Sequence, residues 1–139
     1  MDWTIEFDKA IEQYLPDLEV LQDEPMSRHT TFRIGGPAKR MAFPSSREQL
    51  VLLMSFAKDY GANLLVIGNG SNLLVPDEGL DRLVIDTSAN LNRVERGSGN
   101  TVLADAGATL ARTADLACKS GLTGLEFAHG IPGTLGGGV

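Results

Sequence analysis

Residues 63–75, NLLVIGNGSNLLV, decide the fold, because two short apolar runs flank the loop Gly68-Asn69-Gly70-Ser71-Asn72. Short apolar runs between turn residues predict buried strands, one over 63–68 and another, LLVP at 73–76, directly after the loop. The loop begins like the dinucleotide fingerprint G-x-G-x-x-G, but Leu73 stands at its last position and a strand, not a helix, is expected to follow. A Rossmann fold is therefore disfavoured.

The same loop offers consecutive backbone N–H groups, the hydroxyl of Ser71 and the amide of Asn72. Successive N–H groups at a glycine-rich turn form a concavity for anions, and these donors suit a pyrophosphate. For an isolated GNGSN, a tight turn with polar side chains is the alternative. A second loop rich in glycine, residues 130–138, favours ligand binding, because it could close on the same ligand from another side. No Gly-Lys-Ser/Thr occurs in the chain, which argues against an ordinary nucleotide hydrolase.

Before the first loop, the sequence predicts two helices and two strands. Residues 4–15 have apolar side chains at helical spacing before Pro16, and we expect this helix to cover the fold without entering its core. Residues 29–44, HTTFRIGGPAKRMAFP, predict two short strands joined by a tight turn. Ser45 with Glu48 predicts the start of a second helix that ends at Gly61. One face of this helix is expected to carry Leu50, Leu53, Met54 and Ala57.

After the loop, the sequence predicts one more strand, a hairpin and a helix. The strand is RLVIDTS, residues 82–88, and the hairpin spans 93–107 with its turn at 97–100. Thr109 is expected to cap a helix from 110 to about 119, which Gly121 ends. The order of elements predicts one α+β domain with some βαβ character.

Composition excludes several classes of protein. With 139 residues, 42% of them hydrophobic and 22% charged, the chain is expected to form one globular domain. Its net charge of -6 argues against nucleic acid as the main partner. No signal peptide or membrane-spanning run is recognisable, so we expect a soluble, cytoplasmic protein. The single cysteine, Cys118, excludes an internal disulfide and a multi-cysteine metal site, and its place on a helix predicts a buried position.

The remaining candidates for chemistry are sparse. His29 and His129 lie far apart in the sequence, so the pattern favours a surface or supporting role for each, and no metal site is expected. One basic cluster lies near Gly35-Gly36. It could complement a phosphate, although a solvated face paired with acids is favoured. The cluster comprises Arg28, Arg33, Lys39 and Arg40.

Four motifs, taken in order, resemble the N-terminal half of UDP-N-acetylenolpyruvoylglucosamine reductases, also called UDP-N-acetylmuramate dehydrogenases. They are TTFRIGGPA (30–38), VIGNGSNLLV (66–75), AGATL (106–110) and GLTGLEFAHGIPGTLGG (121–137). The resemblance implies an α+β FAD-binding domain of the p-cresol methylhydroxylase type over 21–139, with residues 1–20 as a helical extension. Two subdomains would grip an extended FAD between them.

The resemblance also implies which residues bind FAD. Residues of the first loop, assigned chiefly to the pyrophosphate, are Gly68, Asn69, Gly70, Ser71 and Asn72. Residues of the second loop are Ile131, Pro132, Gly133, Thr134, Gly136 and Gly137. The entrance motif adds Thr31, Phe32 and Arg33. The glycines of the second loop are expected to let the backbone approach the cofactor. In this family NADPH reduces the flavin, which then delivers hydride to the enolpyruvyl group of a sugar nucleotide during peptidoglycan synthesis.

The chain departs from the family after residue 137, where a Met-Asn-Ala-Gly-Ala-Tyr-Gly run, the rest of the flavin domain and a substrate-binding domain are expected. The family's catalytic residues would lie beyond Val139, so none is assigned here, and the 139 residues alone are expected to be inactive. The sugar nucleotide would bind through the missing domain. Exposed apolar surface, self-association or a disordered tail is expected, with the oligomeric state open. The alternatives are a stand-alone FAD- or nucleotide-binding module without catalysis, or another oxidoreductase of the same flavin fold.

Overall fold

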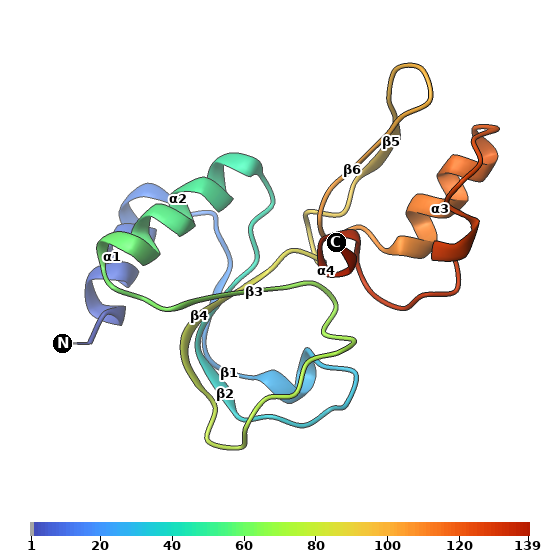
Figure 1. Ribbon diagram of the computed structural model, residues 1–139. Coiled ribbons are helices and arrows are strands. Elements are labelled where there is room, and N and C mark those ends of the chain that lie inside the picture. The colour runs from blue at the N-terminus through green and yellow to red at the C-terminus, as the bar shows by residue number, and fades with distance from the viewer. Residues whose placement is uncertain (1) are drawn as a thin grey trace.

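The computed structural model describes residues 2–139. It has two lobes, one built on a four-stranded sheet and one on a hairpin and a helix (Figure 1). The elements of the first lobe are α1 (Thr4–Tyr14), β1 (Val20–Pro25), the 3-10 helix η1 (Met26–Arg28), β2 (Pro37–Ala42), α2 (Arg47–Asp59), β3 (Leu64–Ile67) and β4 (Leu80–Asp86). Those of the second lobe are β5 (Val94–Arg96), β6 (Val102–Ala104), α3 (Leu110–Lys119), the 3-10 helix η2 (Glu126–Ala128) and α4 (Leu135–Gly138). The expected α+β class is confirmed.

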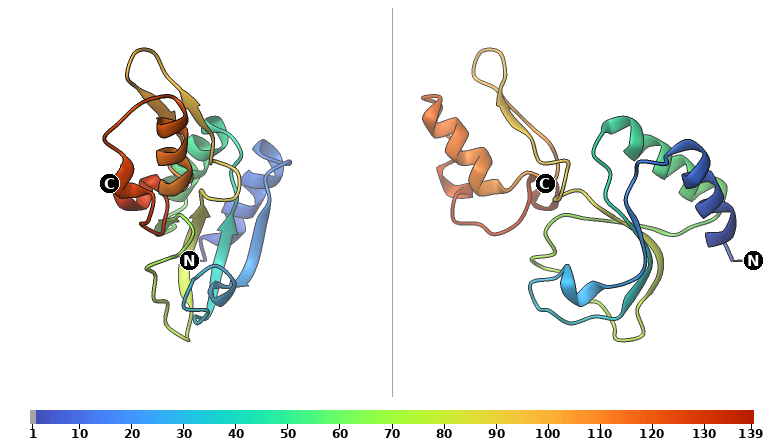
Figure 2. Two further views of the ribbon diagram at one scale, coloured as in Figure 1. Left: turned by 90° about the vertical axis from the view of Figure 1, so that its right-hand side faces the viewer. Right: turned by 180° about the vertical axis from the view of Figure 1, so that it is seen from behind.

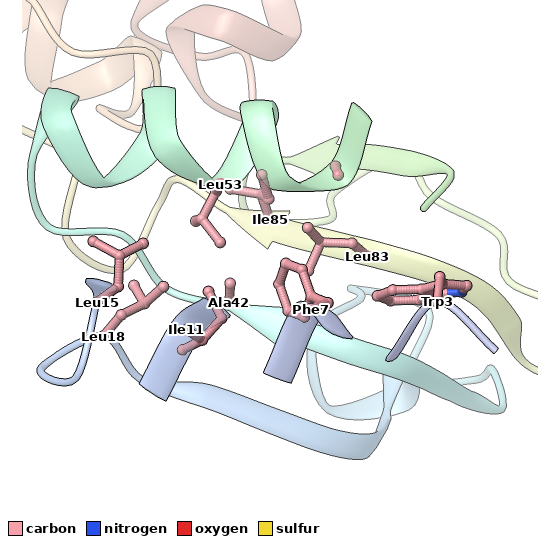
Figure 3. Close-up of a cluster of buried hydrophobic side chains, with 10 residues drawn as sticks. Trp3, Phe7, Ile11, Leu15, Leu18, Ala42, Leu53, Leu83 and Ile85 are labelled. Atoms are coloured by element: carbon pink, nitrogen blue, oxygen red, sulfur yellow. The ribbon is translucent and has the colours of Figure 1, made fainter. Parts of the chain in front are cut away.

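Helices α1 and α2 pack on one face of the sheet, whose strand order is β1-β2-β4-β3 (Figure 1). Their apolar side chains meet Leu83 and Ile85 of β4 in one buried cluster, and Figure 3 shows Phe7 and Leu53 pointing into it from the two helices. Phe7 is completely buried. The prediction that the first helix covers the fold without entering the core is therefore wrong. An apolar stripe at helical spacing needs a partner surface, and the sheet supplies it.

The opposite face of the sheet is covered by loops and the 3-10 helix η1, with no α-helix packed on it. Met26, Met41 and Val84 are fully buried there, with Val75 from the loop 68–79 packed against them. The predicted strand at 73–76 is wrong, because β3 and β4 are parallel neighbours. Parallel strands require the chain to cross back to its starting end. Residues 68–79 make this crossover, which buries Val75 and leaves Leu74 71% exposed.

The first lobe contains one strand that the sequence did not reveal and lacks one that it predicted. Residues 20–25 form β1, which pairs antiparallel with β2 at the edge of the sheet. Its acidic residues are typical of a turn, yet an edge strand tolerates them because the free edge of such a strand faces water. Residues 29–34 form turns, so of the two strands expected in 29–44 only β2 exists.

Helix α2 begins one residue later than predicted. Ser46 is its N-cap and accepts a hydrogen bond from the Gln49 N–H (3.2 Å), while the Gln49 side chain accepts one from the Ser45 N–H (2.8 Å). The helix ends at Asp59, and Gly61 follows with φ +73°, as expected for a residue just past a helix. Of the four residues predicted on its inner face, Leu53 and Ala57 are buried, whereas Met54 is half exposed.

The second lobe agrees with its predicted elements. β5 and β6 form the antiparallel hairpin, and the Thr109 side chain caps α3 by accepting a hydrogen bond from the Arg112 N–H (3.1 Å). Figure 2 shows the hairpin and α3 side by side, away from the sheet. Cys118 is exposed, not buried as predicted, because Ala114 and Ala117 supply the buried face of α3. Residues 133–138 are hydrogen-bonded to residues 106–110 and to one another, in contrast to a disordered tail.

Candidate functional site

The two glycine-rich loops meet in one pocket of about 390 Å³. This volume lies within the range of roughly 300–1,000 Å³ typical of small-molecule sites. The first loop leaves the carboxyl end of β3, where ligands bind in open parallel sheets, and the second loop closes over it from the other lobe. Residues of the first loop lining the pocket are Gly68, Asn69, Gly70, Ser71 and Asn72. Those of the second loop are Ile131, Pro132, Gly133, Thr134, Gly137 and Gly138.

Close contacts within the protein surround three glycines of the two loops. A Cβ on Gly68 would overlap the side chain of Thr134, which is 3% exposed. A Cβ on Gly70 would overlap the carbonyl oxygen of His29, and one on Gly133 would lie 3.2 Å from Ser71 Oγ. Gly68 and Gly70 therefore need to be glycines because neighbouring residues leave no room for a side chain. Room for a ligand cannot be the sole reason for these glycines.

The first loop lines the pocket with residues whose backbone N–H groups are free. Within residues 2–139, no hydrogen bond has its donor in the backbone N–H groups of residues 68–72. Gly70 has φ +66°, the left-handed conformation that turns consecutive N–H groups toward one concavity. The described residues lining the pocket include no ionisable side chain. Backbone dipoles therefore set its electrostatics, which fits a phosphate anion.

The N–H groups of α4 donate hydrogen bonds within the protein. The Leu135 N–H donates to Ala108 O and the Gly136 N–H to Ala106 O, both at 2.8 Å, while the Gly137 N–H donates to Thr134 Oγ1 (3.4 Å). The first two bonds attach the second loop to the segment before α3. The N–H groups of Gly133 and Thr134, which line the pocket, donate no hydrogen bond within residues 2–139, so the second loop supplies both a wall of the pocket and further donors.

Apolar side chains complete the pocket: Leu65, Val66, Ile67, Leu73, Leu110, Ile131 and Pro132. Leu65 lies outside the sequence motifs, whereas Val66, Ile67, Leu73 and Leu110 lie within motifs but were not predicted to bind the cofactor. Val66 is 52% exposed because it points from edge strand β3 into this space. Strand alternation alone could not indicate this, since β3 covers only 64–67. A neutral, partly apolar pocket beside free N–H groups can hold a ligand that joins a phosphate to flat apolar rings.

Four other predicted residues lie outside the pocket lining. Gly136 packs on Ala106, and a Cβ added to Gly136 would lie only 2.9 Å from the Ala106 Cβ. This contact explains why the position has no side chain. Thr31 lies next to the first loop, because its N–H donates to Gly70 O (3.0 Å). Phe32 is 55% exposed, and Arg33 has φ +57° in the same turn.

The basic cluster is largely paired with acids. Arg40 Nε donates to Asp8 Oδ1 (2.9 Å), and this hydrogen-bonded carboxylate raises the pKa of Arg40 above its usual value. Lys39 pairs with Asp2 and Asp81, both at 3.3 Å, and Arg28 lies 3.8 Å from Glu24. The predicted pairing with acids is confirmed for these three residues, but Arg40 is buried and does not belong to a solvated face.

Membrane-spanning helices and metal-binding clusters are both absent from residues 2–139. Within residues 2–139, no helix has both the length and the apolar character needed to cross a membrane. In the same part of the chain, no three His, Cys, Asp or Glu side chains gather as a metal site would require.

The class of protein follows from the family model that matches residues 38–139, described as an FAD binding domain. The chain belongs to this family. The expected fold of the p-cresol methylhydroxylase type is also shown by a solved flavoenzyme, CrmK of caerulomycin biosynthesis (TM-score 0.61, 18% identity, 74% of this chain and 22% of that one), a likeness of fold alone.

The particular relatives are the reductases that the motifs indicated. UDP-N-acetylenolpyruvoylglucosamine reductase of Caldicellulosiruptor bescii is 45% identical over 130 residues, which cover 92% of this chain and 41% of the relative. The crystal structure of UDP-N-acetylenolpyruvylglucosamine reductase (MurB) from Thermus caldophilus matches with a TM-score of 0.59 and 32% identity, over 86% of this chain and 40% of that one. The resemblance is confirmed, and the chain spans about two-fifths of the length of these relatives.

Proposed function

We propose that this chain is the FAD-binding part of a UDP-N-acetylenolpyruvoylglucosamine reductase, an oxidoreductase of peptidoglycan synthesis that works in the cytoplasm. The first loop holds the FAD pyrophosphate by its backbone N–H groups. The second loop, with Ile131 and Gly133, closes the pocket over it. Thr31, Phe32 and Arg33 contact the cofactor beside the first loop. The observation that carries the proposal is the meeting of the two loops in one pocket lined by free backbone N–H donors.

Bound FAD would supply hydride transfer, with NADPH as the reductant and the enolpyruvyl ether of a sugar nucleotide as the substrate. The residues present bind and orient the cofactor. Their donors are already directed by the fold, so a pyrophosphate can bind with little reorganisation. The residues that bind the sugar nucleotide and complete the reaction belong, in this proposal, to a longer chain, and the 139 residues alone have no turnover.

The experiment is a titration of the chain with FAD, followed by quenching of flavin fluorescence. The variant Asn72→Asp adds one negative charge to the first loop at constant size, whereas a substitution at Gly70 would disturb the packing against His29. Coulomb repulsion at this range is expected to weaken FAD binding about ten-fold or more. Asn63→Asp is the matched control, because it adds the same charge to an exposed residue before β3, at the opposite end of that strand.

Saturable binding that Asn72→Asp weakens and Asn63→Asp leaves intact would support the pyrophosphate site. Equal weakening by both variants would indicate a general charge effect and contradict the assignment. If the unaltered chain binds no FAD, these residues do not hold the cofactor by themselves.

A further inference from the structure

Glu24 and His29 form a half-buried pair outside the lining of the pocket. The Glu24 side chain, on β1, is 12% exposed, and that of His29 is 19% exposed. The His29 ring Nε2–H donates to Glu24 Oε1 at 2.8 Å. A carboxylate removed from water in this way needs a hydrogen-bond donor. The pair therefore holds the His29 ring against β1.

His29 is held in place from two further directions. Its backbone N–H donates to Met26 O (2.9 Å), and Met26 is fully buried beneath the sheet. Its ring lies beside the ring of Phe43, with the centroids 5.9 Å apart. The residue therefore connects the sheet to the turn at residues 29–34.

The backbone of the same turn holds Gly70. The carbonyl oxygen of His29 occupies the space where a Cβ on Gly70 would stand, and the Thr31 N–H donates to Gly70 O at 3.0 Å. Gly70 is buried and has φ +66°. Its conformation directs the free N–H groups of residues 68–72, so the shape of the donor loop depends on where His29 lies.

We propose that Glu24 and His29 are positioning residues that fix the shape of the 68–72 loop, and thereby its affinity for the pyrophosphate of a dinucleotide. The part concerning affinity rests on the proposed function. The pair acts through the His29 backbone and touches no ligand. Release of the pair leaves the N–H groups present but no longer held in one orientation, and the loop then has to be ordered when the ligand binds.

The test compares two amides at one position. The His29→Gln side chain places its amide nitrogen where the imidazole Nε2 lies and can still donate to Glu24, whereas the shorter His29→Asn cannot reach it. Asp8→Asn is the control for general destabilisation, because it weakens the Arg40 ion pair between α1 and β2, on elements that do not line the pocket. The readouts are the backbone amide NMR shifts of Gly70 and Ser71 without ligand, and the dissociation constant for FAD.

We expect His29→Asn to shift both amides and to weaken FAD binding about ten-fold, the effect of losing about one hydrogen bond. His29→Gln should restore both readouts, and Asp8→Asn should change neither. Unmoved amides in a folded His29→Asn chain would overturn the proposal. If the amides move while the unaltered chain binds no FAD, the positioning stands, and the proposal that these residues hold the cofactor by themselves fails. Should His29→Asn not fold, Glu24→Ala makes the same comparison from the other partner, with the same outcomes.

Discussion

Gly68 and Thr134 touch so closely that a Cβ on Gly68 would lie 3.0 Å or less from every heavy atom of the Thr134 side chain. The two residues belong to different lobes, Gly68 at the end of β3 and Thr134 at the N-cap of α4. Thr134 also pairs with Thr109, the N-cap of α3, in an isolated antiparallel bridge. This contact joins the two loops that line the pocket.

Gly68→Ala is expected to destabilise the fold by roughly 1–3 kcal/mol, because its methyl group would overlap a buried side chain. Urea denaturation measures this, with Gly130→Ala as the control, since nothing lies within 4 Å of a Cβ there. Thr134→Gly should remove most of the clash in the double variant. Purely additive effects of the two substitutions would show that the residues do not touch.

Deletion of residues 130–139 is expected to lower the melting temperature by several degrees. The segment accepts a hydrogen bond from the Leu110 N–H through Gly133 O (3.1 Å) and donates two more to Ala106 O and Ala108 O. Each such bond contributes about 1 kcal/mol. Removal of Gly138 and Val139 alone is the control, because Val139 is fully exposed. Thermal unfolding followed by circular dichroism makes the comparison. Equal melting temperatures for the full chain and the long deletion would contradict the packed tail.

Acid should weaken the contact between the chain's start and β4. The Trp3 indole N–H donates to the Asp81 carboxylate (3.0 Å), and this bond, with the nearby Lys39 ammonium, lowers the pKa of Asp81. A lowered pKa in the folded state adds stability above the unfolded value of about 3.9, and this stability is lost as the pH falls through the folded pKa. Asp81→Asn should therefore flatten the loss of stability below about pH 5.

Urea midpoints measured from neutral to acid pH provide the comparison for Asp81→Asn. Asp17→Asn removes an exposed carboxylate and serves as the control. At neutral pH, Asp81→Asn should be less stable than the parent chain, whereas Asp17→Asn should match it. In acid, the stability of Asp81→Asn should approach that of the parent chain, because the contribution of the ionised Asp81 is then lost. Indistinguishable acid slopes for the parent chain and Asp81→Asn would count against the role of this contact.

Cys118 is expected to react with a thiol reagent in the folded protein. It is exposed on α3 and is the chain's single cysteine, so one thiol per chain should titrate under native conditions. A rate similar to that in urea is expected, because accessibility controls the reaction here. Ellman's reagent followed by absorbance measures both rates. Protection in the native state would contradict the exposed position and indicate coverage by another copy of the chain.

Local sequence patterns predicted the elements whose formation depends on interactions between residues close in the chain. The capped helix α3, the β5-β6 hairpin and the apolar strand β3 all come from periodicity and turn residues within a few positions. The two candidate loops were predicted for the same reason, because their glycines lie close together in the sequence. Positions of caps were less secure, because Ser45 and Ser46 are both good cap residues and only the observed hydrogen bonds distinguish them.

Tertiary structure decided what depends on residues far apart in the chain. Whether 73–76 is a strand depends on the parallel pairing of β3 with β4, and whether 20–25 is a strand depends on β2. Likewise, Gly68 lacks a side chain because Thr134 lies against it, and Gly70 because His29 does. The sequence by itself determined the family, the helices α1, α2 and α3 and the two glycine-rich loops, through short-range propensity and motif order. Only the fold decided that the loops form one pocket, because contact across lobes is a property of packing and leaves no local pattern.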